Sequence, residues 1–436
     1  MSDHVQHFID FIRNSPCAFH AVSSITHVLK EAGYEELAEG RPWAVVPGGK
    51  YYVTRNRSAV VAFHVPACGF SHFQIVSSHS DSPTFKLKPG FEDEAAGGSY
   101  LRLNVERYGG MIMSSWFDRP LSIAGRMLVH EGGKLSTRLV NLDRDTVLIP
   151  NMPIHFNREV NDGYKYNAQV DLLPLCGSRD CKGLLKKELA AAAGCSEDAI
   201  AACDLFLYSR TPGTVWGAKN EFFSCPRIDD LECAYTSMAA FLGSEPKQHI
   251  SVLAVMDNEE VGSGSKQGAD STFLGDVLAR AGAALGASDS EIRAAIASSF
   301  MVSADNAHAV HPNHPEKYDA QNRTFMNGGV VIKHNANQKY TTDAVSDAVF
   351  TAVCEKAGVP VQHFANRSDV LGGSTLGNIA NTHVSMNTVD IGLAQLAMHS
   401  SYETAGCADV EYMIRALEAF YSSDILMQGD GEFDIL

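Results

Sequence analysis

The sequence contains no Cys-x-x-Cys pair, no long apolar run and no excess of basic residues. Its ten cysteines are scattered, which excludes a zinc-finger spacing and predicts reduced thiols in a reducing compartment. The apolar run at 250–256 has only seven residues, too few to cross a bilayer. The opening segment, 1–16, predicts an amphipathic helix instead of a secretion signal. We therefore expect a cytoplasmic protein with no membrane partner.

The charge balance is strongly acidic, with a formal net charge of −16 over 436 residues. Such a surface repels phosphate backbones, so we expect no nucleic-acid partner. Hydrophobic residues make up 45% and charged residues 20%, which is an ordinary globular mixture. The length predicts two or three domains.

Residues 1–87 and 213–436 alternate helix-like and strand-like segments, whereas 88–212 consists mostly of short strand-like segments. In that middle stretch, paired glycines separate short β-like runs, with one helix near 184–193. The sequence therefore predicts an α/β sandwich in two parts, 1–87 and 213–436, interrupted by a β-rich insert at 88–212.

Polar clusters follow several predicted strands, and ligands of open α/β sheets bind beyond the carboxyl ends of strands. The clusters lie at 79–83, 227–230, 257–263, 303–305 and 398–400. Together they offer histidines and carboxylates without thiolates, a donor set that suits zinc, manganese or cobalt.

Two metal ions need one bridging carboxylate and end ligands on each ion. The set can be divided into a bridge, Asp229, and two pairs of end ligands, His79 with Asp305 and Glu260 with His399. Asp81 lies two residues after His79 and can accept the second imidazole N–H. Glu259 is left to take a proton from water and pass it to a leaving amine.

Each element also has a plain structural interpretation. The His79–Asp81 pair can be a surface turn, the glutamates a solvated pair, His399 a core histidine and Asp305 a helix cap. Their co-occurrence at strand ends favours a metallohydrolase.

Seven ordered blocks resemble the M18 family of metalloaminopeptidases, the aspartyl aminopeptidase group, over nearly the whole chain. They are SHSDSP (78–83), PRIDD (226–230), DNEEVGS (257–263), SADNAHAVHPNH (303–314), VIKHNANQKY (331–340), RSDVLGGSTLG (367–377) and QLAMHS (395–400). The resemblance implies a zinc-peptidase α/β/α sandwich, a β-rich dimerisation domain as the insert, and dodecamers built from dimers.

The resemblance also implies roles for individual residues. It implies that Asp229 bridges the two ions, that His79 and Asp305 bind one of them, and that Glu260 and His399 bind the other. It also implies that Glu259 is the general base and that Asp81 orients His79. His155 resembles a histidine that reaches a neighbouring subunit's active site. The implied substrate contacts are Lys333, Tyr340, Asp369, Gly373 and Ser374. Two divalent ions per subunit are expected, Zn²⁺ first, with Co²⁺ and Mn²⁺ as alternatives.

The expected activity is therefore removal of the N-terminal residue of peptides, with a preference for Asp and Glu. An aminopeptidase preferring neutral residues stays open, because Gly372 replaces a cysteine in the late loop. Another two-metal peptidase or a deacylase on the same scaffold is the first alternative. A catalytically silent assembly protein is the second, although the complete ligand set disfavours it.

Overall fold

The structure, a computed structural model, describes residues 3–436 and consists of two compact units. The first unit comprises the described residues up to Asp81 together with Gly213–Met398 and Glu403–Leu436. The second comprises Ser82–Pro212 and the short segment His399–Tyr402.

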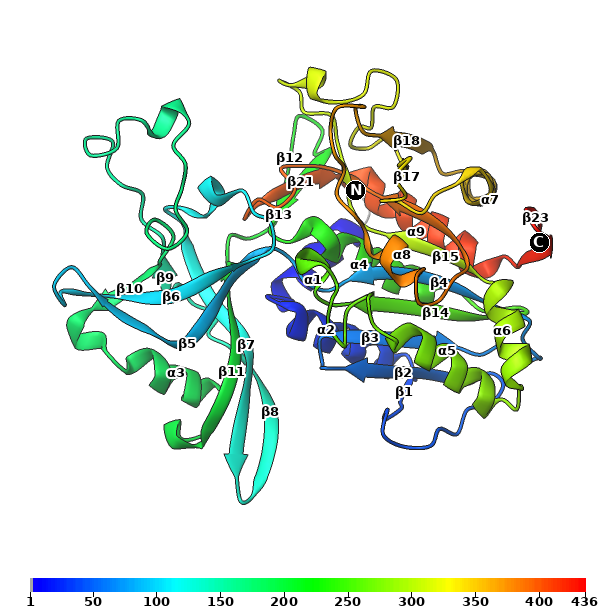
Figure 1. Ribbon diagram of the computed structural model, residues 1–436, viewed down its shortest axis with the longest axis horizontal. Helices are drawn as coiled ribbons and strands as arrows, with labels where there is room; N and C mark the ends of the chain where they lie inside the picture. Colours follow the sequence, from blue (N-terminus) through cyan, green and yellow to red (C-terminus); the bar gives the residue numbers. More distant parts are fainter. Residues whose placement is uncertain (1–2) are drawn as a thin grey trace. The chain divides into compact units, whose positions relative to one another are not determined.

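A nine-stranded sheet forms the centre of the first unit (Figure 1). In spatial order its strands are β1 (Glu35–Glu36), β2 (Lys50–Arg55), β3 (Ala59–His64), β14 (His249–Met256), β4 (His72–His79), β15 (Phe300–Ala304), β19 (Asn387–Gly392), β17 (Val330–His334) and β18 (Val361–Ala365).

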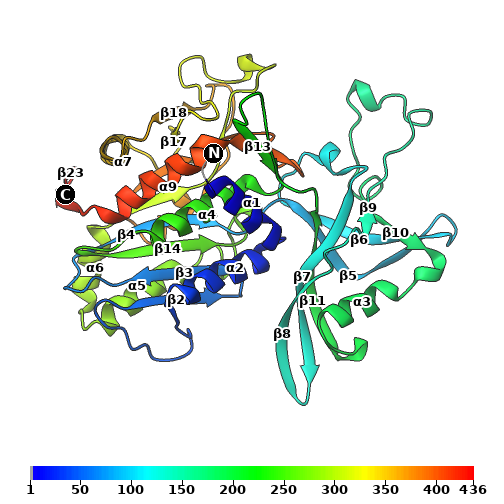
Figure 2. The same ribbon diagram turned by 180° about the vertical axis from the view of Figure 1, so that it is seen from behind.

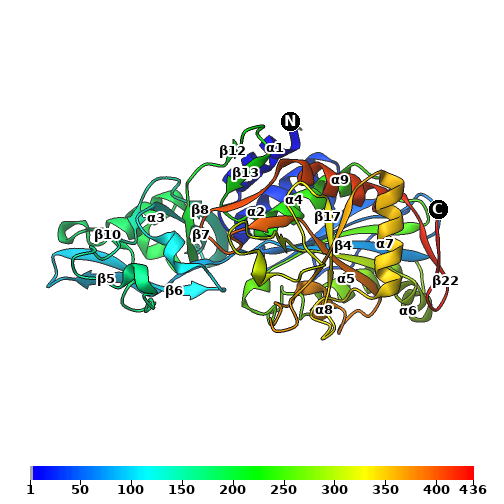
Figure 3. The ribbon, with the colours of Figure 1, turned by 90° about the horizontal axis from the view of Figure 1, so that it is seen from above.

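Helices cover both faces of this sheet, as Figures 2 and 3 show. One face packs against α1 (Asp3–Asn14), α2 (Ala18–Glu31), α4 (Ile228–Leu242), α7 (Ala344–Ala357) and α9 (Cys407–Ser422). The other packs against α5 (Phe273–Ala284), α6 (Asp289–Ala297) and α8 (Leu376–Ala380). The predicted α/β/α layering is confirmed.

The central strands are buried along their length because both of their faces are covered. All eight residues of β4 and all eight of β14 are buried. β4 pairs in parallel with β14 on one side and with β15 on the other, and β15 pairs in parallel with β19. The carboxyl ends of these four strands therefore meet at one edge of the sheet.

Smaller sheets complete the first unit. One has the order β12 (Thr214–Trp216), β13 (Phe222–Cys225), β21 (Glu403–Gly406), β20 (Ala394–Leu396) and β16 (Ala307–His308). The other is the hairpin of β22 (Ile425–Gly429) and β23 (Glu432–Ile435).

The second unit is built on a seven-stranded sheet with one helix, α3 (Leu184–Ala192). Its strands, in spatial order, are β11 (Ile200–Ser209), β5 (Thr84–Ala95), β6 (Tyr100–Tyr108), β10 (Leu175–Ser178), β9 (Val147–Leu148), β7 (Pro120–Glu131) and β8 (Lys134–Asn141). β11 also pairs with β7, so the sheet closes on itself around a core of its own.

Across residues 3–436, none of the helices has the length and apolar character needed to cross a membrane. All ten cysteines are free thiols.

Candidate metal centre

The polar side chains gather where the parallel strands of the first unit end. His79 is the last residue of β4, Asp305 directly follows β15, and a short 3₁₀ turn, η5 (Glu259–Val261), follows β14. Asp229 stands at the start of α4, where its backbone is still non-helical. The shared edge of the sheet thus brings together residues far apart in the chain.

His79, Asp229 and Asp305 form the centre of this cluster, together with Asp230. Each of the four offers one ligand atom, and these atoms lie within 4.8 Å of one another. Nε2 of His79 lies 3.5 Å from Oδ1 of Asp229 and 4.0 Å from Oε2 of Glu259. Imidazole and carboxylate donors are thus concentrated in a volume the size of a coordination sphere.

The two consecutive aspartates have different surroundings. Asp230 accepts the backbone N–H of His79 at 3.0 Å through Oδ2 and that of Asn306 at 3.2 Å through Oδ1. Asp229 points Oδ1 toward His79, and its own backbone N–H donates to Glu403 at 3.1 Å. Asp230 therefore fixes the backbone around the cluster, and Asp229 faces into it.

Asp81 links the ends of β4 and β14. Its Oδ1 accepts the backbone N–H of Glu259 at 3.1 Å, and its Oδ2 accepts that of Glu260 at 3.2 Å. Nδ1 of His79 lies 3.1 Å from the Asp81 carbonyl oxygen and 3.4 Å from its carboxylate. Asp81 thus contacts the imidazole and the backbone of both glutamates.

The electrostatics are those of crowded, buried anions. Burial raises the pKa of Glu259 to about 8 despite the favourable charge of His79, and burial with the nearby Asp229 carboxylate raises the pKa of Glu260 well above its usual value. Burial opposes protonation of His79, yet Asp230, Asp229 and Asp81 raise its pKa well above 6.5. A cation bound among these groups would relieve the repulsion between the carboxylates.

The donor set therefore fits a zinc-type metal. It combines a buried imidazole with several carboxylates, which are ligands that Zn²⁺ takes, at the strand edge where ligands of such sheets bind. Asp81 contacts His79 as an outer partner of a ligating imidazole does.

Lys333 is engaged with Asp305. Only 2% of Lys333 is exposed, and its ammonium donates to the Asp305 carbonyl oxygen at 2.8 Å and lies 3.7 Å from the Asp305 carboxylate. The same ammonium lies 5.3 Å from the ring centre of Tyr340, which is also buried. Burial opposes the charge of Lys333, but Asp305 raises its pKa. Lys333 is therefore a buried lysine and not a solvated surface residue.

The other three expected substrate contacts lie on an exposed segment. Asp369 forms an ion pair with Arg367 at 2.7 Å, and Ser374 donates to Asn378 at 2.8 Å. A Cβ added to Gly373 would meet open space. These residues are thus in a different environment from Lys333 and Tyr340.

Asp390, which the sequence patterns did not single out, accepts hydrogen bonds from both segments: from Thr341, next to Tyr340, and from Thr375, next to Ser374. The buried carboxylate accepts the backbone N–H of Thr341 at 2.5 Å and the Thr375 hydroxyl at 2.7 Å. Asp230 and Glu403 were likewise not assigned roles. Asp230 had a signal, its position next to Asp229, whereas Asp390 sits inside an apolar strand pattern and Glu403 opens the short strand β21.

His155 and His399 belong to the second unit. His155 is exposed in a turn between Ile154 and Phe156, whose exposed fractions are 47% and 82%. His399 is partly buried, has a positive φ of 67°, and its carbonyl oxygen accepts the backbone N–H of Ile112 at 3.0 Å.

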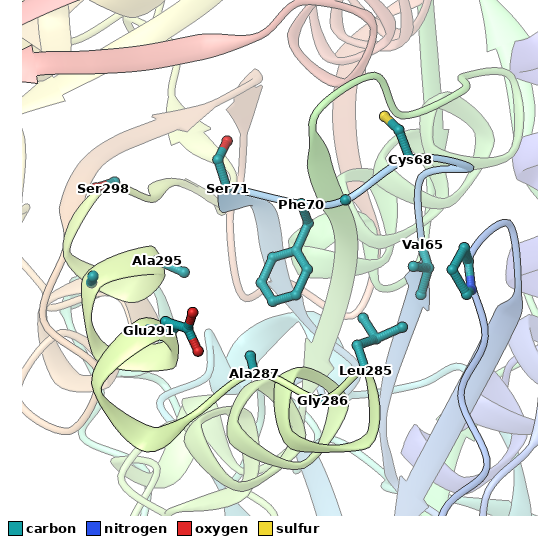
Figure 4. A pocket seen from close by; sticks show the side chains of 13 residues that line it. Val65, Cys68, Phe70, Ser71, Leu285, Gly286, Ala287, Glu291, Ala295 and Ser298 are labelled. Atoms are coloured by element: carbon teal, nitrogen blue, oxygen red, sulfur yellow. The ribbon is translucent and has the colours of Figure 1, made fainter.

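A pocket of about 480 Å³ lies elsewhere in the first unit (Figure 4). Its lining includes Val65, Phe70, Ser71, Leu285 and Glu291. Ser71 immediately precedes β4, whereas His79 ends it, so this pocket is at the amino end of the strand and is separate from the metal cluster.

Comparisons with known proteins agree with this picture. The family model described as "Aminopeptidase I zinc metalloprotease (M18)" matches residues 11–421. "Probable M18 family aminopeptidase 2" of Clostridium acetobutylicum is 46% identical over 423 residues, covering 95% of this chain and 97% of that protein.

Solved structures are similar over the same length. The chain in "Cryo-EM structure of the Ape4 and Nbr1 complex" has a TM-score of 0.93 and 35% identity, covering 96% of this chain and 85% of that one. The chain in "Structure of S. cerevesiae mApe1 dodecamer" has a TM-score of 0.86 and 28% identity, covering 96% of each chain.

The sandwich and its cluster of imidazole and carboxylate ligands define a metal-dependent hydrolase of peptide bonds. The chain belongs to the M18 family of zinc metalloproteases and is a metalloaminopeptidase.

Proposed function

We propose that the protein removes single N-terminal residues from peptides with two divalent ions per subunit. Asp229 would serve both ions, His79 and Asp305 would hold one, and Glu260 and His399 would hold the other. The observation that carries the proposal is the convergence of His79, Asp229 and Asp305 at the strand edge. The assignment of His399 rests on the family pattern. Zn²⁺ is the proposed metal, with Co²⁺ and Mn²⁺ as alternatives.

When bound, the ions supply Lewis acidity, which lowers the pKa of water and stabilises negative charge on the scissile carbonyl oxygen. Glu259 accepts the proton of the attacking water and later delivers it to the departing amine. The Asp81 carboxylate holds Glu259 in place by accepting the Glu259 backbone N–H. The burial of His79 and Asp229 excludes bulk water and strengthens the local electrostatics.

The proposed preference is for N-terminal Asp and Glu. The buried ammonium of Lys333 supports it, because an ammonium has three donor hydrogens and one is directed at the Asp305 carbonyl oxygen. Tyr340 lies beside this ammonium. Asp369, Gly373 and Ser374 complete the proposed substrate contacts from the exposed segment.

The proposed assembly is a homo-oligomer, a dodecamer built from dimers, because a structural relative is described as a dodecamer. Within it, His155 of one subunit completes the active site of a neighbour. The exposed apolar side chains beside His155 support a buried role for this turn in an assembly. Cytoplasmic location remains a prediction, supported by the ten free thiols.

The test uses aminoacyl substrates with free and with blocked N-termini. Chelator-treated protein should be inactive and should recover with Zn²⁺, and only free N-termini should be cleaved. Cleavage of blocked substrates would favour another two-metal peptidase or a deacylase. Faster turnover of leucyl than of aspartyl and glutamyl substrates would overturn the acidic preference and leave the aminopeptidase activity standing.

A further inference from the structure

Two histidines and an aspartate converge on the face of the sheet that α7 covers. His334 is the last residue of β17, His363 lies in β18, and Asp347 lies in the first turn of α7. Three elements that meet only in the folded chain thus contribute one metal-binding side chain each.

The strand register explains why the imidazoles are neighbours. β17 and β18 are parallel, and Ile332 pairs with His363. His334 comes two residues after Ile332 and therefore points to the same face as His363. The opposite face carries Lys333, which precedes His334, and its pairing partner Phe364, which follows His363. On that face Lys333 contacts Asp305. The cluster therefore lies on the opposite face of β17 from Lys333 and its contact with Asp305.

The three donor atoms have the spacing of a coordination sphere. Nε2 of His334 lies 3.2 Å from Nδ1 of His363 and 3.4 Å from Oδ2 of Asp347, and Nδ1 of His363 lies 3.7 Å from Oδ2 of Asp347. A circle through three points so spaced has a radius of about 2.0 Å, which matches Zn–N and Zn–O bond lengths. One ion can therefore contact all three atoms with little movement.

The surroundings favour ligation. Oδ1 of Asp347 accepts the Thr351 hydroxyl at 3.0 Å, which leaves Oδ2 directed at the imidazoles. Burial and the neighbouring His363 lower the pKa of His334 despite the Asp347 charge. The side chains are 34%, 45% and 23% exposed for His334, His363 and Asp347, which admits solvent to the remaining positions.

A second histidine cluster shows what a satisfied network looks like. His249 directs Nδ1 to Asp424 at 2.8 Å and Nε2 to Ser251 at 3.1 Å, and His72 directs Nε2 to Gln74 at 3.2 Å. Each of those ring nitrogens has its own hydrogen-bonding partner. At His334 and His363 the facing ring nitrogens hydrogen-bond only to each other, at 3.2 Å, and both lie within 3.7 Å of the same Asp347 oxygen, so three donor atoms face a common point.

We propose that His334, His363 and Asp347 form a further divalent-cation site that takes Zn²⁺ with three protein ligands and water in the remaining position. A cation there joins β17, β18 and α7. It therefore stabilises the segment of the sheet that carries Lys333, without taking part in the chemistry at Asp229.

The test counts Zn²⁺ in full-length protein that has been stripped with chelator, reloaded with limiting Zn²⁺ and washed. His363→Ala should bind one equivalent fewer than the wild type. Asp347→Asn keeps the shape and the Thr351 contact, and it should weaken this site at least about tenfold, as loss of a ligand or its partner does. Co²⁺ loading should show the visible absorption of a four-coordinate site that disappears in His363→Ala.

His383→Ala is the matched control, because His383 is a partly exposed histidine paired with a single carboxylate, Asp270, at 2.7 Å. It should bind as much Zn²⁺ as the wild type. Zn²⁺ should also raise the Tm of the wild type more than that of His363→Ala. Equal Zn²⁺ content and equal Tm shifts in wild type, His363→Ala and Asp347→Asn would overturn the site.

The number of Zn²⁺ ions bound per chain also distinguishes this site from the catalytic one. In an Asp229→Ala background the His334 site should still bind one equivalent, and the added His363→Ala change should remove it. The difference made by His363→Ala is measured whether or not Asp229→Ala loses metal, so either proposal can fail alone.

Discussion

The Asp81 carboxylate accepts the backbone N–H of Glu259 at 3.1 Å, so a residue two positions beyond His79 holds the proposed general base. Asp81→Asn replaces one acceptor oxygen with an NH₂ group that faces a backbone N–H. We expect metal affinity to fall about 10–100-fold, with a matching loss of kcat at limiting Zn²⁺. Zn²⁺ titrations followed by activity measure both effects. A purely structural role would lower Tm and leave the Zn²⁺ midpoint unchanged.

Glu259→Gln keeps the size of the side chain and removes its ability to accept a proton. We expect turnover to fall about 10²–10⁴-fold with the metal content unchanged, because general-base catalysis contributes factors of that size. Glu355→Gln, an exposed change on α7, is the control and should have wild-type turnover. Near-normal activity of Glu259→Gln would assign the base elsewhere.

Asp229→Ala tests the bridge through metal content. A bridging ligand serves both ions, so both catalytic equivalents should be lost, whereas Asp305→Ala should mainly affect one. Elemental analysis of the purified variants distinguishes the two patterns. If Asp229→Ala retained both ions, the bridging role would be wrong.

Lys333→Met separates substrate recognition from the support of Asp305. If the ammonium also binds a substrate carboxylate, kcat/KM should fall about 10–100-fold more on aspartyl than on leucyl substrates, the range expected for a charged hydrogen bond. Lys339→Met, at an exposed lysine six positions later, is the control. Equal losses on both substrates would restrict Lys333 to holding Asp305.

His155→Ala should lower activity although His155 lies in the second unit. The sharper test mixes His155→Ala with Glu259→Gln subunits. If His155 serves a neighbour, random pairs should recover about a quarter of wild-type activity, because a symmetric interface lets one intact site form in each mixed pair. Mixed samples as inactive as the separate variants, with normal assembly size, would contradict the exchange.

The apolar strand runs predicted much of the architecture. The apolar run at 250–256, too short to cross a bilayer, is β14 less one residue. Buried parallel strands are short and apolar, so the polar residues after them mark the functional edge. That relationship allowed His79 and Asp305 to be selected from the sequence.

Side-chain partners across strands were beyond prediction. The sequence showed Lys333 after two apolar residues, but its neighbour Asp305 comes from another strand, and which one depends on the sheet order β15, β19, β17. The same holds for His334 and His363, which become neighbours only through the register of β17 and β18. The periodicity of a strand predicts which face of the sheet a side chain lies on, but not which residues pack against that face.

The sheet order also governs how the chain must be made. β4 is flanked by β14 and β15, both of which follow the long segment Ser82–Pro212 of the second unit in sequence. At about 5–20 residues per second, a ribosome completes β4 roughly 9–35 s before β14. Throughout that interval β4, whose eight residues are all buried in the folded chain, has no strand paired to either edge, which is a hazard for aggregation and a natural binding site for chaperones. The proteolytic centre therefore assembles late, and a nascent or truncated chain carries its ligands without the ability to cut.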